Sequence, residues 1–157
     1  MAVIKAGIAA STTHVVLDDH SETVASLTLN GPDPDFWTTA DAPDTALYLY
    51  KFMIGPKARG TGLGDALLNW ACTQAQQHGK AWLRLDCWRT NTRLQTYYAR
   101  RGFAPLRTVQ VPGRNSGALM QRPAELRTAN SGITLRDHAE ASLLPMPLHD
   151  VDPSTTR

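Results

Sequence analysis

Residues 54–71 read IGPKARGTGLGDALLNWA. Three glycines, Gly60, Gly62 and Gly64, stand at the start of a run that otherwise has the character of a helix. Glycine in a helix costs about 1 kcal/mol per residue relative to alanine, so these glycines serve another purpose. A glycine-rich turn that leads into a helix exposes several backbone N–H groups, and the helix dipole adds positive charge there. The stretch therefore predicts a phosphate-binding turn, with Arg59 beside it.

The spacing of the glycines excludes two common phosphate motifs. No Lys-Ser or Lys-Thr pair follows the last glycine, as a P-loop requires, and GxGxG differs from the GxGxxG of dinucleotide-binding turns. A simpler alternative is a tight turn that needs positive φ at one or two positions. That alternative does not explain why the glycines alternate so regularly next to Arg59.

The segments on either side of this turn predict a strand, a helix and a second strand. Residues 45–54 (TALYLYKFMI) are typical of a central strand. Apolar residues recur with a period of 3.6 from Leu63 to about His78, and Gly79 follows where a helix would end. Residues 80–88 (KAWLRLDCW) return as a strand. Such a crossover unit is almost always right-handed and joins a parallel pair of strands.

The rest of the chain adds antiparallel strands and one further helix. Residues 13–18 and 23–30 predict a hairpin, residues 103–112 and 116–123 predict two more strands, and a helix is expected over 92–101. Thr92 and Gln95 have the spacing of a capping box at the start of this helix. The fold class is α/β (α+β), with a mixed central sheet and flanking helices.

The sequence changes character after Pro123, which predicts a domain over residues 1–123 and a C-terminal arm or tail over 124–157. The arm is rich in proline and has room for one short helix, near residues 135–144. At the other end, IKAGIAAS (residues 4–11) is interpreted as the stub of a helix.

The composition predicts a cytoplasmic protein. The chain has 157 residues and a net charge of +2, which is too small to indicate nucleic-acid binding. No apolar run approaches the roughly 20 residues of a membrane helix, so we expect no membrane partner. The two cysteines, Cys72 and Cys87, form no CxxC pair, so we expect no metal site and reduced thiols.

Two motifs carry a resemblance to a known family. IGPKARGTGLGDALLNWA resembles the acyl-CoA-binding signature R/Q-x-x-G-x-G/A of the Gcn5-related N-acetyltransferase (GNAT) family. NTRLQTYYARRGF, residues 91–103, is similar to the family's second CoA-side segment, an asparagine followed by a helix that ends in Tyr-x-x-x-Gly-Phe. Order and spacing agree, and the resemblance covers roughly residues 13–122.

The resemblance implies an acetyl-CoA site, with acetyl-CoA as co-substrate. The pyrophosphate would lie on the backbone amides of the glycine turn, and the pantetheine arm would pair with the end of the preceding strand. Asn91 would tie the next strand to the helix or to the pantetheine; a plain turn residue is the alternative. The implied donor-binding residues are Phe52, Met53, Ile54, Arg59, Gly60, Thr61, Gly62, Leu63, Gly64 and Asn91.

The resemblance also implies the chemistry, in which a neutral amine attacks the thioester directly and a tyrosine protonates the departing thiolate. Alignment on Gly102 and Phe103 places Tyr98 in this role, and Tyr97 would point about 100° away around the helix. The alternative for Tyr98 is a phenol packed on the sheet. Three aspartates are candidates for the general base, or else are structural: Asp33, Asp35 and Asp86.

The family normally begins with a strand and two helices that build much of the acceptor side, and most of this part is expected to be missing. The favoured function is N-acetyltransfer from acetyl-CoA to a primary amine of a small molecule or peptide. The acceptor wall would then come from the arm or from a second subunit. A shortened domain would also expose sheet and core, which favours association, so we expect a homodimer or a partner subunit that completes the acceptor site. The alternatives are a catalytically degenerate acyl-CoA-binding or regulatory module, or a GNAT scaffold that serves another reaction.

Overall fold

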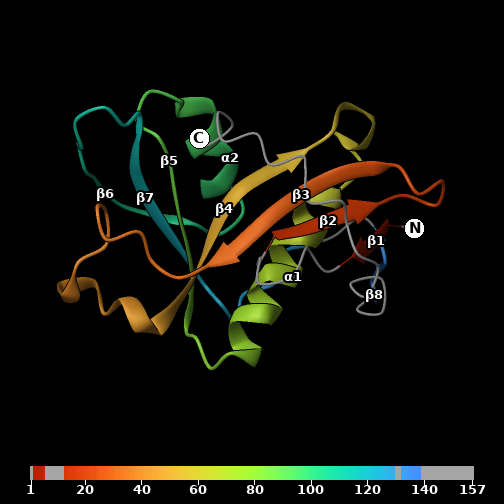
Figure 1. Ribbon diagram of the computed structural model, residues 1–157, viewed down its shortest axis with the longest axis horizontal. Coiled ribbons are helices and arrows are strands. Elements are labelled where there is room, and N and C mark those ends of the chain that lie inside the picture. Colours follow the sequence, from red (N-terminus) through yellow and green to blue (C-terminus); the bar gives the residue numbers. More distant parts are fainter. Residues whose placement is uncertain (1, 6–12, 130–131, 139–157) are drawn as a thin grey trace, which may run out of the picture.

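The computed structural model describes residues 2–5, 13–129 and 132–138 (Figure 1). Within these residues the strands form one eight-stranded mixed sheet in the order β6-β7-β5-β4-β3-β2-β1-β8. The fold class predicted from the sequence is confirmed. In chain order the elements are β1 (Ala2–Lys5), β2 (Thr13–Leu17), β3 (Thr23–Asn30), the 3₁₀ turns η1 (Thr39–Asp41) and η2 (Pro43–Thr45), β4 (Ala46–Ile54), the 3₁₀ turn η3 (Pro56–Ala58), α1 (Leu63–Gln77), β5 (Trp82–Trp88), α2 (Thr92–Ala99), β6 (Ala104–Thr108), β7 (Ser116–Pro123) and β8 (Leu135–His138).

The predicted crossover is present, because β4 and β5 are parallel neighbours and α1 connects them. The helix begins after Gly62 and ends at Gln77, one residue before the predicted end. Its apolar face packs on β4 and β5 and forms the main core with the inward residues of the sheet. The residues of α1 that are buried there are Leu63, Gly64, Ala66, Leu67, Leu68, Ala71, Cys72 and Ala75.

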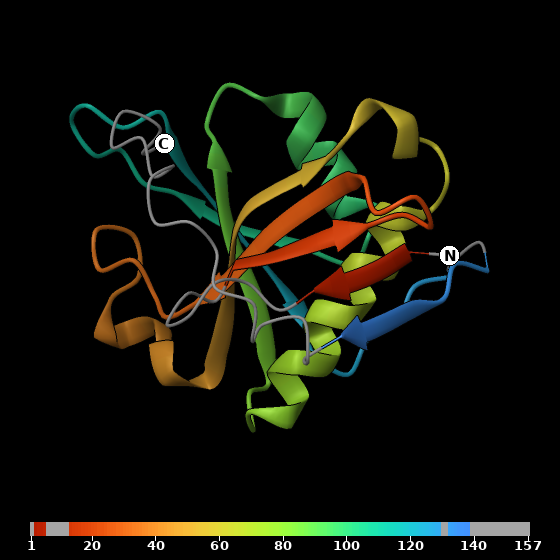
Figure 2. The ribbon, with the colours of Figure 1, turned by 45° about the vertical axis from the view of Figure 1, so that its right-hand side comes forward.

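A second, smaller apolar cluster lies under the loop that joins β3 to β4, on the other face of the sheet, because Tyr48 belongs to it while Leu47 and Leu49 belong to the main core. Figure 2 shows the course of this loop. Phe36 and Trp37 come from this loop and pack with Tyr48 of β4 and Leu119 of β7. Trp37 is 3% exposed, so it belongs to the core. Buried Arg84 lies over the Trp37 ring, with its guanidinium carbon 4.9 Å from the ring centroid.

An ion pair fastens the same loop to the edge of the sheet. Arg107 of β6 donates from Nη1 and Nη2 to the two carboxylate oxygens of Asp41, at 2.7 Å each. The Arg107 guanidinium holds the pKa of Asp41 well below its usual range, and the Thr38 N–H adds to the effect.

Removing this pair should make unfolding less dependent on pH. Because the folded-state pKa of Asp41 is depressed, the pair stabilises the fold above the unfolded-state pKa of about 4 and loses that contribution as pH falls further. Arg107 is partly exposed, so we expect Arg107→Gln to lower the free energy of unfolding at pH 7 by about 1–2 kcal/mol. Urea unfolding at pH 7 and pH 3 measures the difference; an equal loss at both pH values would contradict this assignment.

Two predictions at the ends of the chain are wrong. Residues 2–5 form β1, paired antiparallel with β2, so the expected helix stub does not include Ile4 or Lys5; residues 6–11 of that prediction lie outside the described residues. Residues 135–138 form β8, parallel to β1, where a helix was expected; residues 139–144 lie outside the described residues. The segment that the sequence set apart as an arm therefore adds a strand to the sheet.

The chain between β7 and β8 is attached to α1. Arg122 of β7 is fully buried and donates from Nη2 to Asn69 Oδ1 at 2.7 Å and to the Leu126 carbonyl at 2.9 Å. The same Asn69 oxygen accepts the Thr128 N–H at 3.0 Å. None of the described helices combines the length and the apolar character of a membrane span.

Candidate active site

The parallel strands β4 and β5 separate part-way along their length. The register pairs Leu49 with Leu85 and, within the described residues, no pair further along, although β4 continues to Ile54 and β5 to Trp88. Figure 1 shows the two strands diverging in a V, with α2 beside the opening. Backbone polar groups along this part of β4 have no β5 partner, and an extended ligand can therefore pair with them as an added strand.

A β-bulge in β4 changes which side chains face each side of the sheet. Lys51 has a φ of 50°, and the register between β3 and β4 shifts by one residue there. Before the bulge, Tyr48 and Tyr50 face the second cluster; after it, Phe52 and Ile54 face the main core. Without the extra residue the strict alternation of a strand would put all four on one side. The bulge therefore turns two apolar side chains toward the helices.

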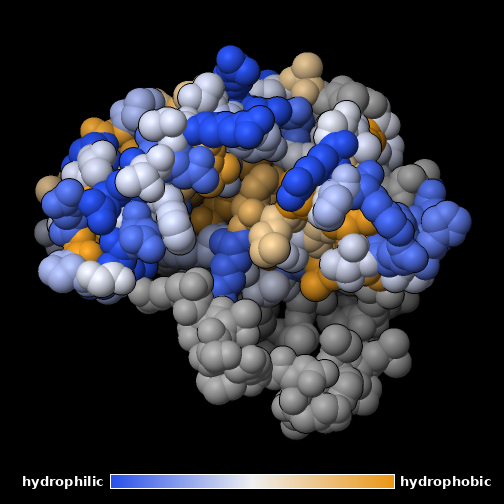
Figure 3. Space-filling view, turned by 90° about the horizontal axis from the view of Figure 1, so that it is seen from above, coloured by the Kyte–Doolittle hydropathy of each residue, from blue (hydrophilic) through white to orange (hydrophobic). Residues whose placement is uncertain are grey.

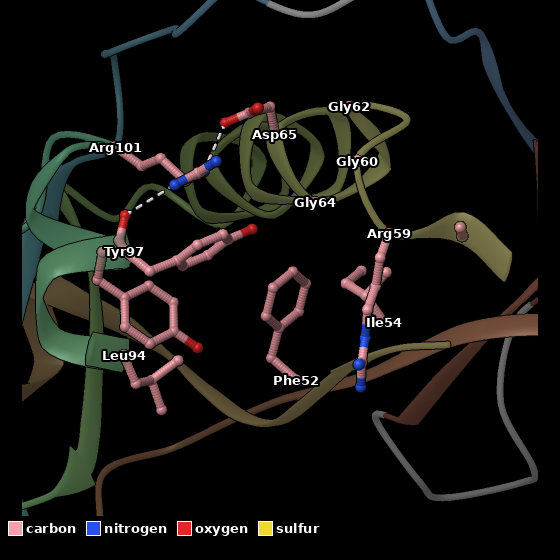
Figure 4. Close-up of a pocket in the computed structure, with 12 residues that line it drawn as sticks. Phe52, Ile54, Arg59, Gly60, Gly62, Gly64, Asp65, Leu94, Tyr97 and Arg101 are labelled. Carbon is pink, nitrogen blue, oxygen red and sulfur yellow. Dashed lines mark hydrogen bonds and ion pairs between the residues drawn. The ribbon is translucent and has the colours of Figure 1, made fainter. Parts of the chain in front are cut away.

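A pocket of about 580 Å³ lies between the end of β4, the glycine turn and α2. Figure 3 looks down on the open end of the V. In this view apolar side chains gather in a hollow, and polar side chains surround it. Figure 4 shows Phe52 and Ile54 rising from β4 toward α1. The lining residues are Phe52, Ile54, Ala58, Arg59, Gly60, Gly62, Gly64, Asp65, Leu94, Tyr97, Tyr98 and Arg101.

The glycine turn forms the wall of this pocket at the start of α1. Gly60 and Gly62 have left-handed φ values of 76° and 87°, which glycine adopts without strain. Within the described residues, Gly62 provides no side-chain cap, and the Leu63 N–H donates to the Thr61 hydroxyl at 3.3 Å. A Cβ built on Gly60 would meet nothing within 4 Å, so the turn is open at Gly60. The positive end of the α1 dipole therefore lies at the pocket wall.

Tyr97 lies across the first turn of α1. A Cβ built on Gly64 would collide with the Tyr97 hydroxyl, which explains why no side chain is present at that position. Arg101 stacks on the Tyr97 ring, with its guanidinium carbon 3.6 Å from the ring centroid. The same guanidinium donates from Nε to Asp65 Oδ1 at 2.8 Å and from Nη1 to the Tyr97 carbonyl at 3.0 Å (Figure 4). Arg101 thus ties α2 to the start of α1.

Tyr98 lies deeper in the pocket wall and is 5% exposed. Its ring centroid is 5.4 Å from those of Tyr97 and Phe103. Burial raises the pKa of the Tyr98 hydroxyl, and the nearby Cys87 of β5 adds to the shift. Cys87 belongs to the part of β5 that has left β4, so Tyr98 lies toward the V and Tyr97 toward α1.

Some of the predicted donor-binding residues do not line this pocket. Met53 is 65% exposed and Leu63 is buried in the main core. The Thr61 hydroxyl donates to the Ala58 carbonyl at 2.5 Å. Asn91 caps α2, because its Oδ1 accepts the Leu94 N–H at 2.9 Å.

The expected capping box at Thr92 and Gln95 is wrong, since the N-cap is one residue earlier, at Asn91. The Gln95 amide instead donates to the carbonyls of Trp88 and Arg89, at 3.0 and 3.2 Å. These bonds hold the start of α2 to the end of β5.

The three candidate bases have different surroundings. Asp33 and Asp35 both pair with Arg114, at 2.8 and 3.1 Å, and so hold the β3–β4 loop to the turn before β7. Asp86 accepts a hydrogen bond from the Ser116 hydroxyl and directly follows Leu85, where the pairing of β4 with β5 stops. Of the three, Asp86 is the residue at the base of the V, although it is not among the residues that line the pocket.

Five pocket residues were not predicted as site residues. Ala58 belongs to η3, Asp65 to α1, Leu94 and Tyr97 to α2, and Arg101 to the turn after α2, so only the packing of these elements brings them together. One signal was present in the sequence: Leu94, Tyr97 and Arg101 recur at intervals of three and four residues, which puts them on one helix face.

Comparison with known proteins agrees with this architecture. The sequence profile of the acetyltransferase (GNAT) family matches residues 5–103. An uncharacterised N-acetyltransferase, YesJ, of Bacillus subtilis (strain 168) is 29% identical over 94 residues, which are 57% of this chain and 52% of the relative. The chain thus spans about half the length of this curated relative.

Solved structures share the fold. Nourseothricin acetyltransferase superposes with a TM-score of 0.56 at 22% identity, and a GNAT-family acetyltransferase from Listeria monocytogenes 4b F2365 with a TM-score of 0.57 at 20% identity. Each match covers 71% of this chain and 64% of the other. The chain belongs to the acetyltransferase (GNAT) family.

Proposed function

We propose that this protein is an N-acetyltransferase, which transfers the acetyl group of acetyl-CoA to a primary amine of a small molecule or peptide. The pocket beside the V carries the proposal. It joins the positive end of a helix, an apolar wall beside an unpaired strand edge, and a buried tyrosine near the point where β4 and β5 separate. An acyl-CoA has a matching order of groups: diphosphate, extended pantetheine and thioester.

The residues present fit such a donor. The open glycine turn leaves room for a diphosphate against the first amides of α1, and Arg59 adds a positive charge at the pocket. The exposed edge of β4 over Phe52–Ile54 offers backbone groups to the amides of pantetheine. Phe52, Ile54 and Leu94 supply the apolar wall.

The proposed reaction needs one acid and one base. The neutral amine attacks the thioester carbonyl carbon, the C–N bond forms, and a β4 backbone N–H stabilises the oxyanion. As the C–S bond breaks, Tyr98 gives its proton to the thiolate. Its raised pKa suits this role, because the phenol stays protonated at neutral pH. Asp86 is the proposed acceptor of the proton that the amine nitrogen loses.

We expect Asp86→Asn to lower kcat by about 10–100-fold while acetyl-CoA affinity stays close to wild type, because the amide cannot take up the proton. Asp35→Asn is the matched control: Asp35 is exposed and shares Arg114 with Asp33, so its rate should stay within about twofold. Thiol release at saturating donor measures both. Equal rates in the two variants would remove Asp86 from the mechanism.

The proposal as a whole is tested by calorimetric titration with acetyl-CoA, followed by assay of thiol release with a panel of primary amines. Micromolar binding and amine-dependent release of thiol are the expected results. Binding without release for any amine would favour an acyl-CoA-binding module, and no binding would overturn the donor site. The proposal includes a homodimer, which light scattering tests; a monomer would count against it.

A further inference from the structure

The Tyr97 hydroxyl occupies a defined place in the pocket. A Cβ added to Gly64 would collide with this hydroxyl. The same Cβ would be 3.9 Å from Ile54 Cγ1. The hydroxyl is therefore at the first turn of α1, beside the glycine turn, and at the α1 end of the pocket. Tyr98, the adjacent residue, faces Phe103 and Cys87 instead.

Within the described part of the chain, the Tyr97 hydroxyl has no hydrogen-bond partner, although the residue is half-buried. Burial raises the pKa of Tyr97, so the group is an O–H donor at neutral pH. A phenol in a pocket wall usually satisfies its hydroxyl with protein, water or ligand. The neighbouring amides at the start of α1 are donors as well, so they cannot accept its proton. The acceptor for this hydroxyl is therefore not among the described residues, and a ligand in the pocket can supply it.

The ring is held in this position. Arg101 stacks on it and bonds to the Tyr97 carbonyl, while its pairing with Asp65 anchors the guanidinium to α1. The pairing also offsets the negative charge of Asp65, which would otherwise repel an anion at the pocket wall. Because the Tyr97 ring is already fixed, its O–H group loses little conformational entropy when it binds a ligand.

We propose that the Tyr97 hydroxyl donates a hydrogen bond to the diphosphate of the acyl-CoA donor, beside the first-turn amides of α1. This inference rests on the acyl-CoA site proposed above. Tyr97 and Tyr98, which are adjacent in α2, would then bind opposite ends of the same ligand. Tyr97 binds the phosphate end, and Tyr98 serves the thioester end.

The test compares two ligands that share the thioester arm and differ in phosphate. Calorimetric titration of wild type and Tyr97→Phe uses acetyl-CoA and S-acetylpantetheine, which has no phosphate. A hydrogen bond to a charged group predicts about tenfold weaker binding of acetyl-CoA by Tyr97→Phe. Binding of S-acetylpantetheine should stay unchanged. Tyr48→Phe is the matched control, because its hydroxyl bonds to Pro43 and Arg84 on the other face of the sheet.

Each other outcome has a distinct meaning. Equal acetyl-CoA affinity in wild type and Tyr97→Phe overturns the inference and leaves the proposed function standing. An equal loss for both ligands also overturns it, because Tyr97 would then act on the pantetheine. A folded wild type that binds neither ligand overturns the proposed function, and the inference with it.

A second pair of variants checks where the hydroxyl lies. Gly64→Ala should change Tm less favourably in wild type than in Tyr97→Phe, because the new methyl group collides with the Tyr97 hydroxyl, while the gain in helix propensity is the same in both. If the change in Tm is equal in the two backgrounds, the hydroxyl does not lie against α1, and the inference fails on geometry alone.

Discussion

Tyr98→Phe should lower kcat by about 100-fold or more while the affinity for acetyl-CoA changes little. The variant removes only the hydroxyl, so the packing of the ring against Phe103 is retained. Without that proton donor the thiolate leaves unprotonated, and general-acid catalysis is typically worth 10²- to 10⁴-fold. Thiol release at saturating acetyl-CoA measures kcat, and calorimetric titration of the same sample measures the affinity for acetyl-CoA.

The pH dependence of kcat adds a second readout for Tyr98. Burial raises the pKa of this phenol, so it stays protonated through neutral and moderately alkaline pH. Tyr98 should therefore cause no fall in kcat below about pH 10, the ordinary pKa of tyrosine. A fall near pH 8 that is present in wild type and absent from Tyr98→Phe would contradict the buried, protonated acid. An unchanged kcat in the variant would exclude Tyr98 as the acid.

Gly62→Glu should weaken acetyl-CoA binding by about 100-fold or more. The carboxylate would stand at the N-cap of α1, where the pocket wall is positive and where we place the diphosphate. Like charges in contact at a binding site cost several kcal/mol, and each 1.4 kcal/mol is tenfold in affinity. Calorimetry on the folded variant measures the loss.

Gly79→Glu is the matched control for backbone strain and for charge. Gly79 also has a left-handed φ, which is 71°, compared with 87° at Gly62. A Cβ built on Gly79 meets nothing within 4 Å. Gly79 follows the far end of α1, so the two variants should lose similar stability while only Gly62→Glu loses binding. Equal acetyl-CoA affinity in both variants would place the phosphate site elsewhere.

Local patterns were sufficient to predict most of the secondary structure. The strands 23–30 and 116–123 have the predicted bounds, and α1 begins at Leu63 as expected. These elements are long, and glycine, proline or polar turns end them, so neighbouring residues alone specify where they begin and end. β1 and β8 were missed because each has four residues; pairing with each other and with β2 makes them strands.

Alternation along β4 could not be read from the sequence. A strict period of two puts Phe52 and Ile54 on the side of Tyr48, and the bulge at Lys51 reverses this. Nothing in YKFMI indicates a residue with positive φ. The bulge forms where β4 pairs with β3, so the register between the strands is responsible.

The sequence by itself determined the parts of the candidate site that lie in one continuous stretch: the glycine turn before α1, Arg59 beside it, and the position of Tyr98 on the second helix. A turn that needs positive φ and a helix with a regular period leave local signals. Only the tertiary structure decided which side chains meet across the pocket. Tyr97 meets Gly64, and Arg101 meets Asp65, because α1 and α2 pack at one end of the sheet. Such contacts join residues more than 30 positions apart, which no local pattern can specify.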